Sequence, residues 1–470
     1  MKLLFIASEV APYSKTGGLG DVVGALPAAL AARGHQVQVV TPRYGSVSTA
    51  KLGPAQHPLT LQFPFGSRIA RYRTVQAAAG LQLTFVEEDG FFGSRPGLYG
   101  YGDDAHRFGF FAMAALSHAR FTRFDPDVIH LHDWQPGLAA LALRTSFASR
   151  ARSVMTIHNI AYQGSFPPSA APELGVPWSL FNPQGVEFYG NFSFLKSALV
   201  YSDALTTVSA SYALEVQTPE GGAGFDGLLR HRAADFTGIL NGIDDSEWNP
   251  DADAHLAAPF SRDDISGKEH CTRALLQEFA LTPGPRAPVF GSVGRMADQK
   301  GVELWQQVVQ EQLGRGAYAV VLGSGEKQLE DRWRELAQKF RGRLGVKIGF
   351  DEGIAHRVEA GCDFFVMPSR FEPCGLNQMY SLRYGTVPIV RAVGGLRDTV
   401  VDLAEPASTG IVFRPYSAAA LAEACDRAWA LWTDAPQLFA VRRRGMSKDF
   451  SWNRSAEQYE AVYAIPRRLR

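Results

Sequence analysis

The chain has 470 residues with 46% hydrophobic and 20% charged side chains, and its 47 Lys and Arg residues balance 47 Asp and Glu residues. Its length exceeds that of a single hydrophobic core, so two or three domains are expected. The zero net charge argues against nucleic acid or an anionic membrane as the main partner. No apolar run approaches transmembrane length. The four cysteines form no CxxC pair, so neither a zinc knuckle nor a disulfide framework is indicated, and a cytoplasmic location fits best.

The N-terminus begins with an apolar run at residues 3–7, which predicts a buried strand rather than a signal peptide because a glutamate follows so soon. A turn then carries Lys15 and the adjacent Gly17 and Gly18, before a helix predicted over residues 22–33. Adjacent glycines let the backbone approach a ligand, and a helix N-terminus favours an anion. The turn is therefore either an anion site or a tight connection with a solvated lysine.

Similar apolar runs alternate with helical patterns through the first half of the chain. The predicted strands after the first are residues 37–41, 81–87, 128–134, 153–157, 204–208 and 237–240. Polar groups lie just past several of these strand ends, which is typical of a doubly wound α/β domain.

Two features of this half leave alternatives open. His130 and His132 share one strand face and precede Asp133, so they are either metal ligands or, as the sheet-edge position favours, groups that hydrogen-bond a substrate. The aromatic stretch with Tyr99 and Tyr101 either stacks on sugars or packs as a surface loop.

Residues 250–285 are predicted to connect two domains. Asp251 and Asp253 form a D-x-D pair, which in some glycosyltransferases holds a divalent cation against a diphosphate. The pair follows Asn249-Pro250 without a buried strand before it, so a solvated loop is the favoured interpretation.

A second series of strands and helices begins near residue 289. Its predicted strands are residues 289–293, 318–322, 346–349, 363–367, 387–390 and 411–413. The turn after the first of these carries Arg295 and Lys300, and a guanidinium and an ammonium in one loop suit phosphate oxygens. A glycine pair at Gly394 and Gly395 opens another helix and is a second candidate anion site.

The segment from Ser369 to Leu376 follows a buried strand and precedes a helical pattern. It contains Glu372, Cys374 and Gly375 at the carboxyl end of a strand, where open α/β sheets usually bind ligands. If the two sheets face one another, these loops would bind one ligand in a cleft between the domains.

In this order the motifs closely resemble those of the bacterial glycogen synthase and plant starch synthase family, over nearly the whole chain. The matching segments are Lys15-Thr16-Gly17-Gly18-Leu19, His132-Asp133-Trp134, Thr156 to Gly164, Asn241-Gly242-Ile243-Asp244, Gln299-Lys300-Gly301, Ser369 to Leu376, Gly394-Gly395-Leu396 and Phe450-Ser451-Trp452.

The resemblance implies a GT-B fold, in which two Rossmann-like doubly wound domains face a central cleft. It implies an N-terminal acceptor-side domain over residues 1–245, a nucleotide-sugar domain over 246–450, and a C-terminal helix in 451–470 that packs back on the first domain. The implied reaction transfers glucose from ADP-glucose to the non-reducing end of an α-1,4-glucan such as glycogen, with retention and without a metal or other cofactor. The sequence does not indicate the oligomeric state.

The resemblance also implies roles for individual residues. Arg295 and Lys300 would bind the diphosphate, joined by Lys15 and by the backbone of Gly17, Gly18, Gly395 and Leu396. His158, Asn241 and Glu372 match the family residues that hold the glucosyl hydroxyls. Asp133 would act near the sugar or the acceptor, and Phe350 would stack on the adenine. Cys374 and Gly375 are matched to the substrate-binding site.

Some alternatives remain at this stage. Glu372 is either a sugar-binding carboxylate, as the family implies, or a covalent nucleophile, and Cys374 is either a reactive thiol or a packed one. The chain has Gln135 where the family often has a histidine, which affects acceptor contacts more than donor chemistry. Competing functions are a related two-domain transferase that uses UDP-glucose or a small sugar acceptor, a metal-dependent transferase built on Asp251 and Asp253, and a catalytically silent glucan-binding or regulatory homologue.

Overall fold

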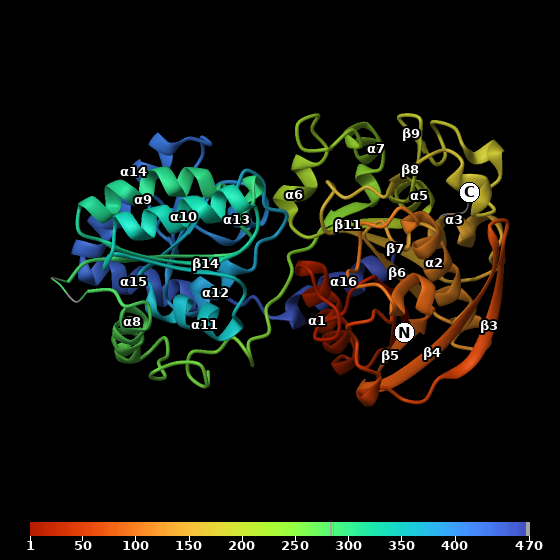
Figure 1. Ribbon diagram of the computed structural model, residues 1–470, viewed down its shortest axis with the longest axis horizontal. Coiled ribbons are helices and arrows are strands. Elements are labelled where there is room, and N and C mark those ends of the chain that lie inside the picture. Colours follow the sequence, from red (N-terminus) through yellow and green to blue (C-terminus); the bar gives the residue numbers. More distant parts are fainter. Residues whose placement is uncertain (283, 285, 467–470) are drawn as a thin grey trace. The chain divides into compact units, whose positions relative to one another are not determined.

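The computed structural model describes residues 1–282, 284 and 286–466, and the remaining positions of the predicted domains lie outside the described residues (Figure 1). The chain divides into two compact units. Unit 1 comprises residues 1–208, 213–242 and the described residues from 452 onward, and unit 2 comprises residues 209–212 and 243–451. Each unit has a largely parallel sheet with helices, so the prediction of two Rossmann-like doubly wound domains is confirmed. None of the described helices is long and apolar enough to span a membrane.

Unit 1 is built on a nine-stranded sheet with the order β12-β11-β7-β6-β1-β2-β5-β4-β3. The strands are β1 (Lys2–Ile6), β2 (Gln36–Pro42), β3 (Gln56–Phe63), β4 (Gly66–Ala78), β5 (Leu81–Glu87), β6 (Val128–His132), β7 (Arg152–Ile157), β11 (Ala204–Thr207) and β12 (Phe236–Gly238). Neighbouring strands are parallel except in the pairs β3–β4 and β4–β5, which are antiparallel. Buried apolar runs such as Leu3 to Ala7 occupy the middle of the sheet, as continuous burial on both faces requires.

The sequence analysis missed β3 and β4, which add an antiparallel edge to the sheet. Most side chains of β3 are exposed or half-buried, so the strand lacks the continuous apolar run that identifies the inner strands. Three short strands between residues 165 and 193 form a small second sheet: β8 (Ser165–Phe166), β9 (Glu187–Phe188) and β10 (Asn191–Ser193).

The helices of unit 1 connect and cover these strands. They are α1 (Gly18–Ala32), α2 (Asp104–Phe121), α3 (Gly137–Thr145), α4 (Ala170–Glu173), α5 (Phe194–Tyr201), α7 (Asp226–His231) and α16 (Trp452–Tyr463), while α6 (Ala210–Glu215) begins in unit 2. Helix α1 begins at Gly18, earlier than the predicted residue 22, because the glycines themselves enter its first turn. Helix α16 packs against α1, and the Arg33 guanidinium pairs with the Glu460 carboxylate at 2.8 Å.

Unit 2 contains a six-stranded, fully parallel sheet with the order β15-β14-β13-β16-β17-β18. The strands are β13 (Val289–Val293), β14 (Tyr318–Gly323), β15 (Leu344–Ile348), β16 (Phe364–Met367), β17 (Val387–Arg391) and β18 (Ile411–Phe413). The helices are α8 (Ser266–Glu278), α9 (Val302–Gly314), α10 (Lys327–Lys339), α11 (Glu352–Gly361), α12 (Asn377–Arg383), α13 (Gly394–Thr399), α14 (Ala418–Thr433) and α15 (Ala435–Met446). In Figure 1, α9, α10 and α14 cover one face of this sheet, and α8, α11 and α12 cover the other.

In each sheet, the strands that follow the first strand in sequence are added on one side of it and then on the other. The position where the strand order reverses is the switch point. In unit 1 the first strand, β1, lies between β2 and β6; in unit 2 the first strand, β13, lies between β14 and β16. The crevice outside the carboxyl ends of the strands at this position is where open α/β sheets bind ligands. Each unit therefore has one switch point, and the loops after β1, β6, β13 and β16 lie beside it.

Candidate functional site

The switch point of unit 2 brings together the two loops that carry Arg295, Lys300 and Glu372. The Lys300 ammonium lies 2.6 Å from Oε2 of Glu372, and the Ser369 hydroxyl donates to the same oxygen at 3.2 Å. Glu372 is only 5% exposed, whereas 27% of the Lys300 side chain is exposed. Arg295 is exposed, and its side chain has no hydrogen bond or ion pair to any described residue. The site thus offers one unpaired cation beside a fixed cation–carboxylate pair.

The glycine after Lys300 explains why these two loops can meet. Gly301 has a φ of +65°, and a Cβ atom there would lie 2.0 Å from the Pro368 carbonyl oxygen. No side chain fits in that space. The backbone N–H of Arg370 also donates to the Gln299 carbonyl at 2.8 Å, so the two motifs are joined directly.

The glycine pair after β17 packs against the same turn. A Cβ atom on Gly395 would lie 2.0 Å from the Cys374 carbonyl oxygen. The N–H of Gly395 donates to the Glu372 carbonyl at 3.1 Å, and the N–H of Leu396 donates to the Val393 carbonyl at 3.0 Å. Both N–H groups predicted to bind phosphate are therefore already bonded within unit 2, and a phosphate contact would have to share or replace those bonds.

Cys374 and Gly375 shape the turn rather than project from it. Cys374 is 5% exposed, and its carbonyl accepts a hydrogen bond from the Gln378 side chain at 3.1 Å. Gly375 has a φ of +73°, a conformation that L side chains rarely adopt. A packed thiol is the arrangement observed, which favours the inert alternative for Cys374.

Phe350 stands apart from these groups at the carboxyl end of β15. Its side chain is 79% exposed, which is unusual for so large an apolar residue. An exposed ring at the ligand-binding edge of a parallel sheet offers a flat surface for a planar group.

In unit 1, the loop after β1 is held in place by Glu9, a residue that the sequence analysis did not select. Glu9 is 3% exposed and accepts three hydrogen bonds: from the Thr16 N–H at 2.6 Å, the Thr16 hydroxyl at 2.7 Å and the Tyr99 hydroxyl at 2.6 Å. The adjacent Lys15 is 40% exposed and pairs with Asp21 at 2.6 Å. Glu9 therefore fixes the backbone from which Lys15 projects.

Gly17 and Gly18 lie at the open N-terminus of α1. Gly17 is the N-cap residue, and no side chain caps the helix. A Cβ atom at either glycine would meet nothing within 4 Å. No protein atom therefore requires glycine at these two positions, which agrees with space kept free for a ligand.

Beside β6 and β7, three polar side chains form a buried row. Asp133 has a left-handed φ of +57° and accepts a 2.7 Å hydrogen bond from the His158 backbone N–H. Nε2 of His158 lies 2.9 Å from Nδ1 of His132. A non-glycine residue with positive φ at a strand end is a sign of a functional constraint. The structure thus brings Asp133 and His158 together.

Burial sets the charge of this row. It raises the pKa of Asp133 to about 7, against hydrogen bonds from the His158 and Asn159 N–H groups that lower it. Burial lowers the pKa of His158 to about 3 and that of His132 well below its ordinary value. Both imidazoles are therefore neutral near pH 7, whereas Asp133 is about half ionised there.

Two further side chains at this edge have buried oxygen atoms without a hydrogen-bond partner among the described residues. They are Oδ1 of Asn241, which follows β12, and Oε1 of Gln135. Each residue is 5% exposed. Unpaired buried acceptors are costly in the free protein, and a ligand hydroxyl would satisfy them. The sequence marked Gln135 only as a departure from the family pattern, and its burial and its oxygen without a partner among the described residues add a reason for an acceptor contact.

Two of the alternatives left open by the sequence are decided by contacts. Both ring nitrogens of His130 are bonded, to Tyr463 at 2.8 Å and to Thr156 at 2.6 Å, so His130 is structural. The hydroxyls of Tyr99 and Tyr101 bond to Glu9 and to the backbone of Gly97, so their loop is packed rather than free to stack on sugars.

The prediction of a solvated loop at Asp251 and Asp253 is wrong for Asp253. Its side chain is only 2% exposed and accepts a 2.7 Å hydrogen bond from His356 and a 2.6 Å hydrogen bond from Tyr384. Both partners lie more than 100 residues away in the sequence, so the local sequence contains no sign of this burial. The carboxylate has no free edge for a diphosphate-bound cation.

Comparison with known proteins places both units in sequence families. Residues 2–231 match the model of the starch synthase catalytic domain, and residues 277–437 match that of glycosyl transferases group 1. The glycogen synthase of Myxococcus xanthus is 52% identical over 98% of this chain and 99% of its own length. That of Anaeromyxobacter is 50% identical over 98% and 99%. The solved catalytic domain of starch synthase IV from Arabidopsis thaliana, bound to ADP and acarbose, has a TM-score of 0.91 and 34% identity and covers 98% of each chain.

Proposed function

We propose a mechanism for this chain on the premise that it belongs to the glycogen synthase and starch synthase family of glycosyltransferases. The chain has the GT-B fold and functions as a glycogen synthase. Its donor is a nucleotide sugar and its acceptor a glucan. The finer proposal is that glucose passes from ADP-glucose to the non-reducing end of an α-1,4-glucan with retention. The ADP bound by the starch synthase relative supports this choice of donor.

The observation that carries the mechanism is the unpaired Arg295 beside the Lys300–Glu372 pair at the switch point of unit 2. The bond that breaks joins the glucosyl C1 to a diphosphate oxygen, so negative charge grows on the leaving group. A guanidinium can bind two phosphate oxygens at once, and an ammonium adds a point charge. Donors that are already in place stabilise that charge without reorganisation. We assign diphosphate binding to Arg295 and Lys300.

We assign a phosphate-binding role also to Lys15 and to the N-terminus of α1 at Gly17 and Gly18. The support is an exposed ammonium beside a helix terminus without a side-chain cap. We also assign phosphate binding to Gly395 and Leu396, because they lie against the Glu372 turn. Their N–H groups already donate to backbone carbonyls, so a phosphate would have to share or replace those bonds. Phe350 is assigned to stack on the adenine, because its ring is exposed.

The glucosyl group is neutral, and we propose that buried polar side chains hold it by hydrogen bonds to its hydroxyl groups. These are His158, Asn241 and Asp133 in unit 1 and Glu372 in unit 2, with Cys374 and Gly375 shaping the pocket wall. The unpaired Asn241 oxygen and the neutral His158 ring suit hydroxyl groups. Hydrogen bonds to sugar hydroxyls that strengthen as positive charge develops on the ring would lower the barrier.

In the proposed step, the C4 hydroxyl oxygen of the acceptor forms a bond to C1 of the glucosyl group. The bond from C1 to the diphosphate oxygen breaks, and ADP leaves with that electron pair. The acceptor proton passes to the departing phosphate oxygen, so no separate base is required. Glu372 is proposed to bind the sugar rather than to attack C1, because Lys300 and Ser369 hold its Oε2 in one orientation.

Neither a metal nor another cofactor is part of this mechanism, since the cations at the diphosphate are side chains. We propose that the protein acts without a metal or other cofactor and that it is cytoplasmic. A metal-dependent route through Asp251 and Asp253 is disfavoured because Asp253 is buried and bonded within unit 2.

The experiment is incorporation of radiolabelled glucose into glycogen from ADP-glucose and from UDP-glucose, with EDTA present and absent. Strong incorporation from ADP-glucose in EDTA is the expected result. Incorporation from UDP-glucose alone would contradict the donor assignment, and loss of activity in EDTA restored by Mn²⁺ would contradict the metal-free step. No incorporation by a folded protein would remove the assigned reaction and favour the silent glucan-binding homologue.

A further inference from the structure

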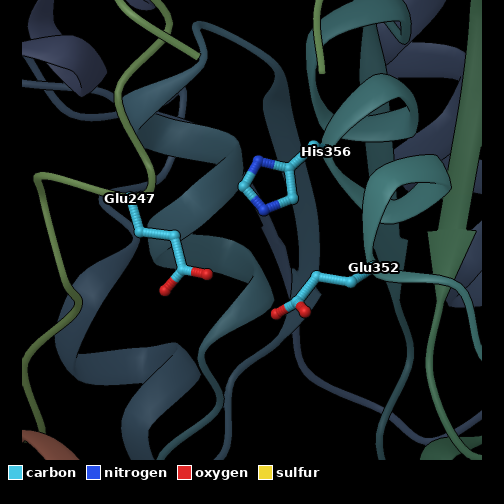
Figure 2. Close-up of side chains that lie close together, drawn as sticks. All are labelled: Glu247, Glu352 and His356. Carbon is cyan, nitrogen blue, oxygen red and sulfur yellow. The ribbon is translucent and has the colours of Figure 1, made fainter. Parts of the chain in front are cut away.

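A cluster of potential metal ligands lies in unit 2 and includes none of the residues assigned to the donor. Glu247, Glu352 and His356 offer ligand atoms that all lie within 4.8 Å of one another. Glu352 and His356 lie on the first turns of α11, and Glu247 lies on the coil segment near the start of unit 2. Figure 2 shows the three side chains converging on one space, with the two carboxylates on the same side of the imidazole ring.

The His356 ring is fixed before any ligand arrives. It is 1% exposed and stacks on the Trp248 ring, with centroids 3.7 Å apart. Its Nδ1 lies 2.7 Å from Oδ2 of Asp253. That carboxylate also accepts bonds from the Tyr384 hydroxyl at 2.6 Å and from the His255 N–H at 2.8 Å.

These contacts determine which ring nitrogen of His356 carries a proton. Both oxygens of Asp253 accept hydrogen bonds from groups that can only donate to it, Oδ2 from the Tyr384 hydroxyl and Oδ1 from the His255 N–H. An ionised carboxylate can only accept, so Nδ1 donates its proton to Asp253. The lone pair of a neutral ring is then on Nε2.

Nε2 of His356 is buried and has no hydrogen-bond partner among the described residues. The edge of the imidazole ring that carries Nε2 faces the carboxylates of Glu247 and Glu352 (Figure 2). A lone pair directed at two carboxylates places acceptors against acceptors, which is unfavourable without a positive charge between them. The buried, oriented nitrogen is a second feature, independent of the two glutamates, that points to a cation.

We propose that Nε2 of His356 and the carboxylates of Glu247 and Glu352 bind one divalent transition-metal cation. One imidazole and two carboxylates are a ligand set that suits Zn²⁺ and its neighbours in the first transition series. Asp253 provides the carboxylate behind the histidine that fixes the ring in many metal sites. Because both glutamates are exposed, water completes the coordination.

The bound cation joins the first residues of unit 2 to α11, since Glu247 precedes the first helix of the unit and Glu352 begins α11. Its effect is on the stability of this edge of unit 2 and not on the transfer step. Activity in EDTA is therefore expected to persist, and the test of this site does not depend on activity.

The test is Zn²⁺ binding by calorimetry to the full-length protein, after treatment with EDTA and removal of the chelator. Wild type is expected to bind one equivalent, and Glu247→Gln and Glu352→Gln are each expected to weaken binding roughly tenfold or more, since each removes a ligand. Glu269→Gln is the matched control: Glu269 is an exposed glutamate in the first turn of α8, the helix that packs against α11. Its Zn²⁺ affinity should equal that of wild type.

The melting temperature provides a second measurement. Zn²⁺ should raise it for wild type and for Glu269→Gln, and should raise it less for the two ligand variants, because binding to the folded state alone stabilises that state. Histidine ¹⁵N spectra of wild type should show one imidazole nitrogen shifted by Zn²⁺, a readout that needs no variant. Absence of Zn²⁺ binding by wild type, or equal affinity in wild type and both ligand variants, would overturn the site.

Discussion

Unit 1 and unit 2 have the same arrangement of central strands around the first strand, but the side chains at the carboxyl ends of these strands differ in charge and burial. At the switch point of unit 2, Arg295 is exposed and the half-buried Lys300 pairs with Glu372, so both cations remain in contact with solvent. Beside the switch point of unit 1, Asp133 and His158 are buried, with the pKa of Asp133 raised to about 7 and that of His158 lowered to about 3.

This difference follows from the depth of the side chains and not from the topology. A cation that remains hydrated keeps its charge and can attract a diphosphate. A titratable group that is removed from water loses charge near neutral pH and becomes a hydrogen-bonding group for a neutral sugar. One fold can therefore provide both of the proposed sites, one for an anion and one for a sugar, depending on how deeply the loop side chains are buried.

The largest expected effect is the loss of the unit 2 cations. Arg295→Ala and Lys300→Ala should each lower kcat/KM with ADP-glucose by ~10²–10³, because each removes stabilisation of the leaving diphosphate. Steady-state kinetics with glycogen measures this. Arg332→Ala and Lys327→Ala are the controls, since both residues are exposed on α10 of the same unit. Wild-type kinetics in a folded Arg295→Ala protein would remove this residue from the mechanism.

The next effect concerns the packing that holds Glu372. Gly395→Ala places a Cβ atom 2.0 Å from the Cys374 carbonyl oxygen and should displace the Glu372 turn, with a loss in kcat of roughly 10² because misplacement of about 1 Å can cost that much. Gly314→Ala is the control, since a Cβ atom there meets nothing within 4 Å. Equal turnover of the two variants would show that the close approach of these loops does not matter for catalysis.

A smaller effect is expected at the nucleobase. Phe350→Ala should raise KM for ADP-glucose about tenfold and leave kcat nearly unchanged, because stacking of a base on an aromatic ring contributes about 1–3 kcal/mol. Phe439→Ala, which changes another exposed phenylalanine of unit 2, should leave both constants unaltered. A change in kcat without a change in KM would assign Phe350 a different role.

The smallest expected effect is on the pH dependence of the free energy of unfolding, through a buried histidine of unit 1. Burial lowers the pKa of His118 to about 4, so an unfolded His118 gains a proton as pH falls below 6.5 while the folded residue does not. Stability should therefore fall between pH 6.5 and pH 4 by roughly 1 kcal/mol per pH unit from this group. Urea unfolding should show a smaller pH dependence in His118→Gln than in wild type.

His270→Gln is the control for this measurement, because His270 is exposed on α8 and its substitution should not alter the pH dependence. If His118→Gln kept the full pH dependence of wild type, the neutral state assigned to this histidine would be wrong.

Much of this arrangement could be predicted because it depends on local patterns. Apolar runs identified the inner strands, and the polar residues past their ends indicated where ligands bind. The motif containing Lys300 and the motif containing Glu372 could be related to one function, although 72 residues separate the two side chains. The half-exposed strands β3 and β4 were missed because they lack a continuous apolar run.

Features that depend on distant partners could not be predicted. The Asp253 carboxylate is buried by His356 and Tyr384, and the His132–His158 contact forms only when β6 and β7 lie side by side. Nothing near Glu9 in the sequence reveals that it accepts bonds from Thr16 and Tyr99. The pKa shifts of Asp133 and His158 likewise require burial, which a sequence pattern indicates only in part.

The most direct test of the central claim is calorimetric titration of ADP into wild type, Arg295→Ala, Lys300→Ala and the Lys327→Ala control. Arg295→Ala and Lys300→Ala should each weaken ADP binding by about 10- to 150-fold, because each removes a charged hydrogen bond to phosphate. The control should bind ADP as wild type does. Unchanged ADP affinity in both Arg295→Ala and Lys300→Ala would contradict the claim that the switch point of unit 2 holds the diphosphate.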